Sequence, residues 1–451
     1  MSLATSLPNA TSPEPEPGSS ALRLELLRDP EAAGKRLEAI AWRTGSGQSR
    51  AAAERVEAIL EQVQREGDSA LIELTERFDG VRPDPLRIPL AELEAAWQAT
   101  PVDLQEALKL AHRRIVDFHQ RQKPADLDVK GVHGERLGRR WRPVERAGLY
   151  VPGGRASYPS TVLMNAVPAR VAGVQRLVMV TPPGSDGRVN QTVLAAAHLA
   201  GIEEIYRVGG AQAIAALAFG TATIPRVDVI SGPGNLYVTL AKKAVYGRVA
   251  IDSLAGPSEV LVIADHTADP EHVAADLLAQ AEHDPLAAAI LLTTSEDLAR
   301  AVPAAIEAQL EGHPRGAITR QALNDWGLIV VCPSLEEAAR LSDRFAPEHL
   351  ELQVERPEPL AERIQQAGAI FLGAWTPEAV GDYLAGPNHT LPTSGTARFS
   401  GALSVETFLR HTSLIRFNRA ALEATGAAVI TLAESEGLHS HAESVRRRLA
   451  R

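Results

Sequence analysis

Gln280 and His283 are the first residues in this sequence whose types and spacing could do chemistry. They lie three positions apart at the end of the run 251–283, which has the pattern of a strand and then a helix starting at 269–271. Residues three apart share one helix face, so the amide oxygen and an imidazole nitrogen could bind one cation. A solvated helix face or a hydrogen-bonded histidine is the alternative interpretation of the same pair.

Glu348 and His349 are a second candidate, placed where a helix pattern gives way to a strand pattern in the pentapeptide 346–350. An adjacent carboxyl group and imidazole could supply a general base and an activator of water. The alternative is a helix-terminal pair that only makes hydrogen bonds. The pentapeptide by itself favours the second interpretation.

Asp382 and His389 follow in turns rich in glycine and proline. Asp382 offers a hard anionic ligand, and core packing does not explain a histidine in such a turn, although a solvated side chain would. Together with Gln280, His283 and one C-terminal histidine, Asp382 would complete a nitrogen and oxygen ligand set without a thiolate. That set suits Zn(II), with Mn(II) or Co(II) as replacements.

Glu436 and His441 are further candidates in a C-terminal segment with a helical pattern that begins near residue 404. Five positions on an unbroken helix separate two side chains by about 140°, given 3.6 residues per turn. Both can therefore reach one site only if Gly437 breaks the helix or if they have separate tasks. Such a tail often docks on its own chain or on a partner subunit.

The elements that must position these residues are predicted to alternate between strands and helices. A helical pattern covers 51–122, and extended segments within 140–154 lead into the alternation. Parallel sheets covered by helices on both faces are expected. The predicted strands lie near 177, 205 and 227 and over 259–263, 289–292, 328–331, 350–354 and 369–372.

Two glycine-rich turns, 209–212 and 232–235, each lead from a predicted strand into a helix. Ligands of open α/β sheets bind beyond the carboxyl ends of the strands, and small residues let a helix start approach a pyrophosphate. No G-x-G-x-x-G followed by a suitably spaced acid is present, so the dinucleotide fingerprint is missing. From the glycines alone, a tight helix start is favoured over a nucleotide site.

The composition limits the class of protein. The chain has 451 residues, a formal net charge of -10 and one cysteine, Cys332. Its length predicts two or more domains, and its charge argues against nucleic acid as a partner. It has neither an apolar run of about twenty residues nor a secretory signal, so we expect no membrane partner. The single cysteine, in an apolar strand end, predicts a cytoplasmic protein with a buried thiol.

Taken together, the motifs identify a resemblance: the chain is similar to the histidinol dehydrogenase family. The matching segments extend from Gly148 to His441 in one order, whereas the helical region before them, from about Gly45, carries no motif that can be quoted. They are 148–154, 209–212, 232–235, 251–252, 255–259, 280–283, 347–350, 381–383, 386–392 and 436–441.

The resemblance implies NAD-dependent oxidation of L-histidinol to L-histidine through the aldehyde, the last step of histidine biosynthesis. It implies one Zn(II) per subunit, bound by Gln280, His283, Asp382 and His441. The implied substrate contacts are Ser258, Gln280, His283, His349, Asp382, His389, Glu436 and His441, and the implied NAD contacts are Tyr150, Gln212 and Asn235. Glu348 and His349 would be the catalytic acid/base pair.

The implied assembly is an intertwined homodimer whose C-terminal tail carries Glu436 and His441 into the neighbouring subunit's active site, which removes the helix-face difficulty. The expected fold class is α/β, with two Rossmann-like parallel-sheet domains that lack the fingerprint, and small extended terminal segments. The expected divisions are a disordered tail (1–21), a small segment (22–44), a large metal and catalytic domain (45–149 and 258–403), an NAD-binding domain (150–257) and a dimerisation tail (404–451).

The lack of an accessible thiol bears on the chemistry, because many aldehyde oxidations pass through a cysteine thiohemiacetal. A base-activated water is needed instead, so we expect His349 to remove the alcohol proton and Glu348 to activate the water that hydrates the aldehyde. Two other classes remain: a zinc hydrolase that uses the same pair on water, and a non-catalytic metal- or nucleotide-binding relative.

Overall fold

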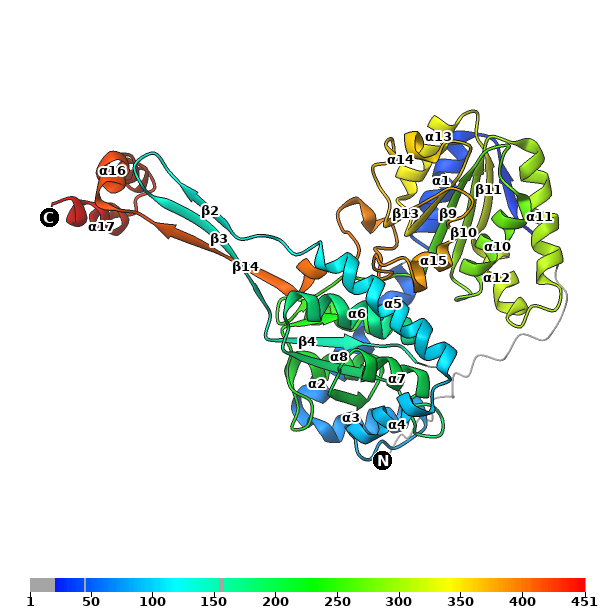
Figure 1. Ribbon diagram of the computed structural model, residues 1–451, viewed down its shortest axis with the longest axis horizontal. Coiled ribbons are helices and arrows are strands. Elements are labelled where there is room, and N and C mark those ends of the chain that lie inside the picture. Colours follow the sequence, from blue (N-terminus) through cyan, green and yellow to red (C-terminus); the bar gives the residue numbers. More distant parts are fainter. Residues whose placement is uncertain (1–20, 44–45, 154–157, 451) are drawn as a thin grey trace, which may run out of the picture. The chain divides into compact units, whose positions relative to one another are not determined.

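The computed structural model describes residues 21–43, 46–153 and 158–450 (Figure 1). The predicted disordered tail, 1–21, lies outside the described residues except for Ala21. The chain forms two compact units, and each is described by itself. The first unit consists of the described residues within Met1–Arg55, Asn235–Leu240 and Ser253–Ala402. The second consists of those within Val56–Gly234, Ala241–Asp252 and Leu403–Arg451.

The first unit contains a parallel sheet of the order β1-β11-β10-β9-β12-β13. Its strands are β1 (Glu25–Leu27), β9 (Glu259–Ala264), β10 (Ala288–Thr293), β11 (Gly327–Val331), β12 (His349–Gln353) and β13 (Ala369–Leu372). The five strands predicted for this segment are thereby confirmed, and β1 is an addition. The order reverses between β9 and β12, which pair in register with Leu261 opposite Leu350.

Helices cover both faces of this sheet, which is why β9, β10 and β12 are buried along their whole length. One apolar cluster joins the sheet to α10 (Pro270–Ala281), α11 (Glu296–Leu310) and α12 (Gly316–Trp326). The other joins it to α1 (Pro30–Ala41), α13 (Leu335–Phe345) and α14 (Pro357–Ala361). The short helix α15 (Glu378–Tyr383) follows β13.

Helix α10 begins as the sequence predicts and ends earlier than expected. Asp269 caps it by accepting a hydrogen bond from the backbone N–H of Glu271, and Pro270 occupies the first turn. The helix ends at Ala281, so Gln280 lies in its last turn and His283 lies just beyond it. The expectation that both residues share a helix face is therefore only half right.

The second unit contains a parallel sheet of the order β6-β5-β4-β7-β8. Its strands are β4 (Arg146–Tyr150), β5 (Arg176–Thr181), β6 (Glu204–Arg207), β7 (Val229–Ser231) and β8 (Ala250–Ile251). Its helices are most of α2 (Ser46–Glu66), α3 (Asp68–Asp79), α4 (Leu90–Ala99), α5 (Val102–Gln120), α6 (Pro159–Ala172), α7 (Gln191–Leu199), α8 (Gly210–Phe219) and part of α9 (Leu236–Val245). The strand order reverses between β4 and β7, which marks a topological switch point.

The grouping of segments differs from the sequence-based division. Residues 56–149 belong to the same compact unit as 150–234, whereas we grouped 45–149 with 258–403. Strand β4, which ends at Tyr150, pairs with β5 and β7 and so links the two segments directly. The behaviour of these units as folding domains stays a prediction.

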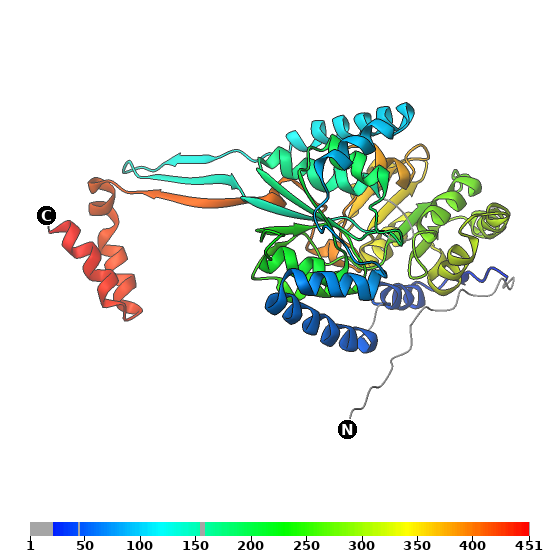
Figure 2. The same cartoon turned by 90° about the horizontal axis from the view of Figure 1, so that it is seen from below.

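A small antiparallel sheet of β2 (Leu127–Lys130), β3 (Arg136–Pro143) and β14 (Leu409–Arg416) also belongs to the second unit (Figure 2). The expected helical pattern from residue 404 is therefore wrong for β14, and it holds for α16 (Arg419–Ser435) and α17 (His439–Leu449). Strand β14 is exposed along most of its length, so its sequence shows no alternation of apolar and polar residues. Its partner β3 lies far away in the sequence, so no local pattern predicts that the two strands pair.

Two further expectations can be compared with the fold. Cys332 is buried, and burial raises the pKa of its thiol to about 12, which confirms an inert apolar residue. No helix in the described parts of the chain is long and apolar enough to cross a membrane. The cytoplasmic location stays a prediction.

A buried ion pair fixes the turn after β7. The Lys242 ammonium pairs with Asp252 and donates to the carbonyl of Gly232 at 3.0 Å, while Asp252 accepts from the Gly232 N–H at 2.8 Å. Gly232 has a φ of 115°, and a Cβ there would lie 2.0 Å from the carbonyl oxygen of Tyr150. Only glycine fits this turn, for both conformational and steric reasons.

We therefore expect Gly232→Ala to destabilise the protein more than Gly187→Ala. Gly187 also has a positive φ, of 76°, but its Cβ would meet nothing within 4 Å. Gly187→Ala should lower the free energy of unfolding by about 1–2 kcal/mol, the cost of a left-handed residue. Gly232→Ala should lower it by a further ~1–3 kcal/mol through overpacking. Urea unfolding measures both changes, and equal losses would contradict the steric argument.

Candidate active site and metal centre

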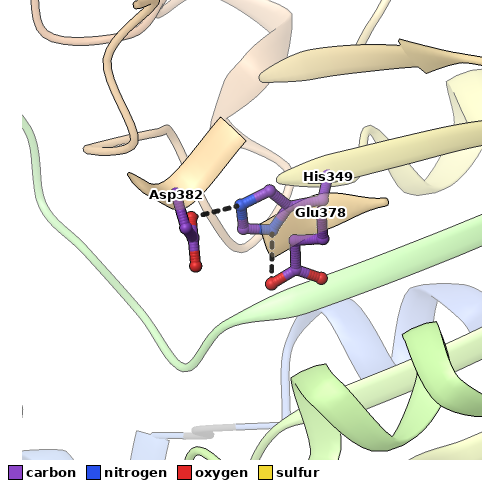
Figure 3. A group of neighbouring side chains, drawn as sticks. All are labelled: His349, Glu378 and Asp382. Atoms are coloured by element: carbon purple, nitrogen blue, oxygen red, sulfur yellow. Dashed lines mark ion pairs between the residues drawn. The ribbon is translucent and has the colours of Figure 1, made fainter. Parts of the chain in front are cut away.

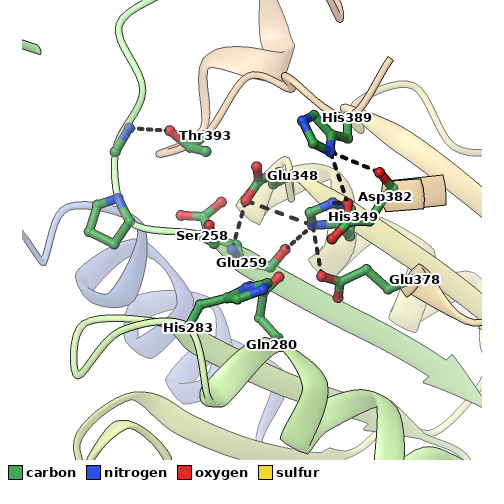
Figure 4. Close-up of polar contacts among 12 residues, drawn as sticks. Ser258, Glu259, Gln280, His283, Glu348, His349, Glu378, Asp382, His389 and Thr393 are labelled. Atoms are coloured by element: carbon green, nitrogen blue, oxygen red, sulfur yellow. Dashed lines mark hydrogen bonds and ion pairs between the residues drawn. The ribbon is translucent and has the colours of Figure 1, made fainter. Parts of the chain in front are cut away.

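The acid/base candidates Glu348 and His349 are buried side by side at the start of β12 (Figure 4). Glu348 Oε2 accepts the backbone N–H of Glu259 at 2.9 Å and lies 3.7 Å from Nδ1 of His349. His349 Nδ1 lies 3.0 Å from the carbonyl oxygen of Glu259. When Nδ1 donates to that carbonyl, Nε2 is left to accept a proton. Both side chains are thus anchored to the first residue of β9.

The surroundings raise the pKa of both groups, for different reasons. Burial raises the pKa of Glu348 to about 7, and nearby carboxylates add to the effect. Burial alone would lower the pKa of His349, but the surrounding carboxylates, chiefly Glu378, raise it well above its ordinary value. The carboxyl group of Glu348 is therefore set to exchange a proton near neutral pH, as a general base needs.

His349, Glu378 and Asp382 form a group that could hold a metal ion, with one ligand atom of each within 4.8 Å of the others (Figure 3). Nδ1 of His349 is 3.9 Å from Glu378 Oε1, and Nε2 is 3.8 Å from Asp382 Oδ1. The group contains one predicted ligand, Asp382. Helix α15 supplies both carboxylates, spaced four residues apart on one face.

Gln280 and His283 do meet, as their spacing predicts. With the Gln280 amide oxygen facing His283, it accepts from Nδ1 at 2.9 Å, and the amide nitrogen donates to Glu378 Oε1 at 3.3 Å. This orientation gives each polar atom a suitable partner. The pair therefore borders the same group of side chains as His349 (Figure 4).

His389 also belongs to this cluster. Its Nδ1 lies 3.0 Å from the backbone carbonyl of Asp382 and 4.0 Å from Asp382 Oδ1. Burial lowers the pKa of both His389 and His283, which favours neutral imidazoles. Burial would raise the pKa of Asp382, but the imidazoles, first of all His349, lower it. Neutral imidazoles beside an ionised carboxylate are the forms that ligate metal ions.

Arg43 and Glu259 support the site and were not singled out from the sequence. Their side chains form a buried ion pair at 3.0 Å. Arg43 also donates to the carbonyls of Pro257 and Ser258, at 2.8 and 3.1 Å, and so holds the segment that carries the predicted substrate contact Ser258. No sequence pattern marks Arg43, because its partner lies more than two hundred residues away.

Glu378 was also missed. An acidic residue in the first turn of a helix is normally explained by the helix dipole, so its position carried no signal for a site. The structure buries it almost completely, and burial raises the pKa of its carboxyl group to about 8. Only its tertiary contacts, with His349 and Gln280, show its place in the cluster.

The predicted NAD contacts follow the carboxyl ends of strands in the second sheet. Tyr150 ends β4, and its hydroxyl accepts from the N–H of Gly210 at 3.1 Å, while Gln212 lies buried in α8 after β6. Burial raises the pKa of Tyr150 to about 12. Asn235, which belongs to the first unit, follows β7 in the chain. Its side chain accepts from the N–H groups of Tyr237 and Val238 at the start of α9.

Glu436 and His441 lie in the second unit, whereas Gln280, His283 and Asp382 lie in the first. Both side chains are exposed, with Glu436 at the end of α16 and His441 in the first turn of α17. Gly437, at a φ of 71°, separates the two helices. The helix is therefore broken between Glu436 and His441, one of the two arrangements that the sequence allowed.

Taken together, the fold and the cluster define an α/β protein with a buried acid/base pair beside a candidate metal-binding group. A family model described as Histidinol dehydrogenase matches residues 43–449. The chain is 67% identical over 435 residues to the histidinol dehydrogenase of Parasynechococcus marenigrum, covering 96% of this chain and 100% of the relative. It is 70% identical over 424 residues to the histidinol dehydrogenase of Prochlorococcus marinus strain MIT 9313, and the match covers 94% of this chain and 96% of the relative.

A solved structure agrees with these relatives. The histidinol dehydrogenase of Elizabethkingia anophelis is 38% identical, with a TM-score of 0.89 and coverage of 96% of this chain and 99% of that chain. The chain belongs to the histidinol dehydrogenase family, and its activity is the last step of histidine biosynthesis. The dehydrogenase interpretation is thus confirmed over the hydrolase.

Proposed function

We propose that this chain oxidises L-histidinol to L-histidine in two steps through the aldehyde, with NAD as hydride acceptor and one Zn(II) per subunit. The observation that carries the proposal is the buried Glu348–His349 pair, with His349 facing Asp382 at 3.8 Å. An acid/base pair beside candidate metal ligands is what oxidation of a metal-held alcohol requires.

The donor chemistry of the first unit fits Zn(II). Gln280 offers an amide oxygen, His283 a neutral imidazole and Asp382 an ionised carboxylate, and the described residues contain no accessible thiol that would favour a different set. We assign the fourth protein ligand to His441 of the partner subunit. Bound there, Zn(II) would hold the imidazole and amine of the substrate and so place its carbinol.

The substrate would lie against the side chains of Ser258, His389 and, from the partner subunit, Glu436. In its neutral form, with Nδ1 donating to the carbonyl of Glu259, His349 would remove the proton of the alcohol at Nε2. The carboxylates that raise the pKa of His349 would stabilise the imidazolium that results. Glu348 then takes a proton from the water that adds to the aldehyde, which its pKa of about 7 suits.

The arrangement of the second sheet supports the NAD assignment. Its strand order reverses between β4 and β7, and dinucleotides bind in the crevice at the carboxyl ends of strands beside such a reversal. Tyr150 ends β4, and Gln212 and Asn235 follow β6 and β7. We assign these three residues as NAD contacts. When bound, NAD would accept the hydride in each oxidation.

Zinc dependence gives the first test. Protein treated with a chelator should lose production of NADH from histidinol, and added Zn(II) should restore it, because the substrate would otherwise lack a fixed position. The absorbance of NADH is the measurement. Full activity in metal-free protein would contradict the zinc assignment, and hydrolysis without NADH would contradict the oxidation.

Glu348→Gln tests the division of labour. It should lower the rate of aldehyde oxidation by roughly 10²–10⁴-fold, the usual contribution of a general base, and alter alcohol oxidation much less. Single-turnover NADH formation from histidinol and from histidinaldehyde separates the half-reactions. Glu362→Gln, an exposed substitution of the same kind, is the control. Equal loss of both half-reactions would show that Glu348 has no separate task.

The dimer with shared sites predicts complementation between two inactive variants. Co-expressed His349→Asn and His441→Asn subunits should recover about a quarter of the original activity, because half of the random dimers then hold one intact site. A mixture of His349→Asn and Asp382→Asn subunits should recover nothing. Each site takes both His349 and Asp382 from the first unit of one subunit, so every site in a mixed dimer keeps one of the two changes. No recovery from the first mixture would rule out a shared site.

A further inference from the structure

Behind the metal group lies a second cluster of polar side chains, formed by Asp276, Glu351 and Gln353, which we call the tether. All three are buried in the first unit, with 8%, 1% and 4% of their surface exposed. Neither the acid/base chemistry nor the metal ligands account for them. Burying such groups is unfavourable unless their hydrogen bonds are satisfied, so their contacts indicate what they do.

The contacts of the tether join three elements. The Gln353 amide nitrogen donates to Asp276 Oδ2 at 2.7 Å and to Glu351 Oε2 at 2.9 Å, which links α10 to β12. Glu351 Oε1 accepts the backbone N–H of Glu378 at 3.0 Å, which links β12 to the start of α15. The carboxyl groups of Asp276 and Glu351 also share a hydrogen bond.

Each of these elements carries part of the candidate metal site. Asp276 lies one helical turn before Gln280 on α10, and Glu351 lies two residues after His349, on the same face of β12. Helix α15 begins at the residue that Glu351 holds and carries Glu378 and Asp382. A six-residue helix has little stability of its own, so its position depends on such anchors.

We propose that the tether positions the metal-binding groups by fixing α10 and α15 against β12. Asp276, Glu351 and Gln353 are positioning residues and do not touch the metal or the substrate. The inference rests on the proposed zinc site and identifies the residues that hold its metal-binding groups in position. Outer partners that orient metal ligands commonly govern the affinity of a site.

The experiment compares two substitutions in the full-length protein. Glu351→Leu removes the acceptor for the Glu378 N–H and the contacts to Asp276 and Gln353. Asp276→Asn preserves the network, because its amide oxygen accepts from Gln353 and its amide nitrogen donates to Glu351. Zinc affinity, from competition with a chelator, and amide hydrogen exchange of α15 are measured for each.

Glu351→Leu should weaken zinc binding by about 10–100-fold, accelerate exchange in α15 and lower kcat, while the KM for NAD stays unchanged. Asp276→Asn should retain zinc binding and exchange close to those of the unsubstituted protein. If Glu351→Leu does not fold, Asp276→Ala provides the same test through the α10 contact alone. Asp276→Ala should also weaken zinc binding.

Asp265→Ala is the matched control. Asp265 is a buried carboxylate at the opposite end of β9, and it accepts the backbone N–H of Glu355 at 2.9 Å, much as Glu351 accepts that of Glu378. Its loss should reduce stability without changing zinc affinity. If Asp265→Ala weakens zinc binding as much as Glu351→Leu does, general destabilisation explains the result and the tether is overturned.

The outcomes separate the tether from the proposed function. If the unsubstituted protein binds no zinc, the metal assignment fails, and exchange in α15 still decides whether Glu351 positions that helix. If the unsubstituted protein binds zinc and Glu351→Leu binds it equally well, with unchanged exchange, the tether is overturned and the zinc site stands.

Discussion

The burial of carboxyl groups around His349 is the constraint on which the rest of the site depends. Glu348, Glu378 and Glu259 are almost fully excluded from water, and desolvation raises the pKa of each. Arg43 offsets the charge at Glu259, and His349 lies among the others. Acidic side chains therefore outnumber basic ones in a region from which water is largely excluded, and this excess favours a bound cation. The same burial raises the pKa of Glu348 toward neutral pH.

Backbone groups at the amino ends of β9 and β12, where the strand order reverses, hold these buried side chains in place. Glu259 begins β9 and His349 begins β12. The backbone of Glu259 donates its N–H to Glu348 and offers its carbonyl to Nδ1 of His349, which fixes the candidate acid/base pair. Ligands of parallel sheets usually bind beyond the carboxyl ends of the strands, and in the second sheet Tyr150 lies at such an end, that of β4. The candidate residues of the two sheets therefore lie at opposite ends of their strands.

Much of the fold and part of the site could be predicted from sequence, because both rest on local patterns. Apolar runs marked the buried strands of both parallel sheets, and Asp269 with Pro270 marked the start of α10. The spacing of Gln280 and His283 predicted their contact, since the last turn of α10 and the backbone turn after it bring residues three apart together. Strand β14 escaped detection because an exposed strand lacks the alternation that burial imposes.

The sequence by itself determined which chemical groups are available: the adjacent Glu348 and His349, the oxygen and nitrogen ligands, and the lack of a second cysteine. Only the tertiary structure decided which of them share an environment. Arg43 and Glu378 belong to the site because they contact residues far from them in the chain. Asp276 and Glu351 contact each other next to the site. The physical reason is that desolvation and long-range hydrogen bonds arise only when the strands and helices pack, whereas local spacing records neither.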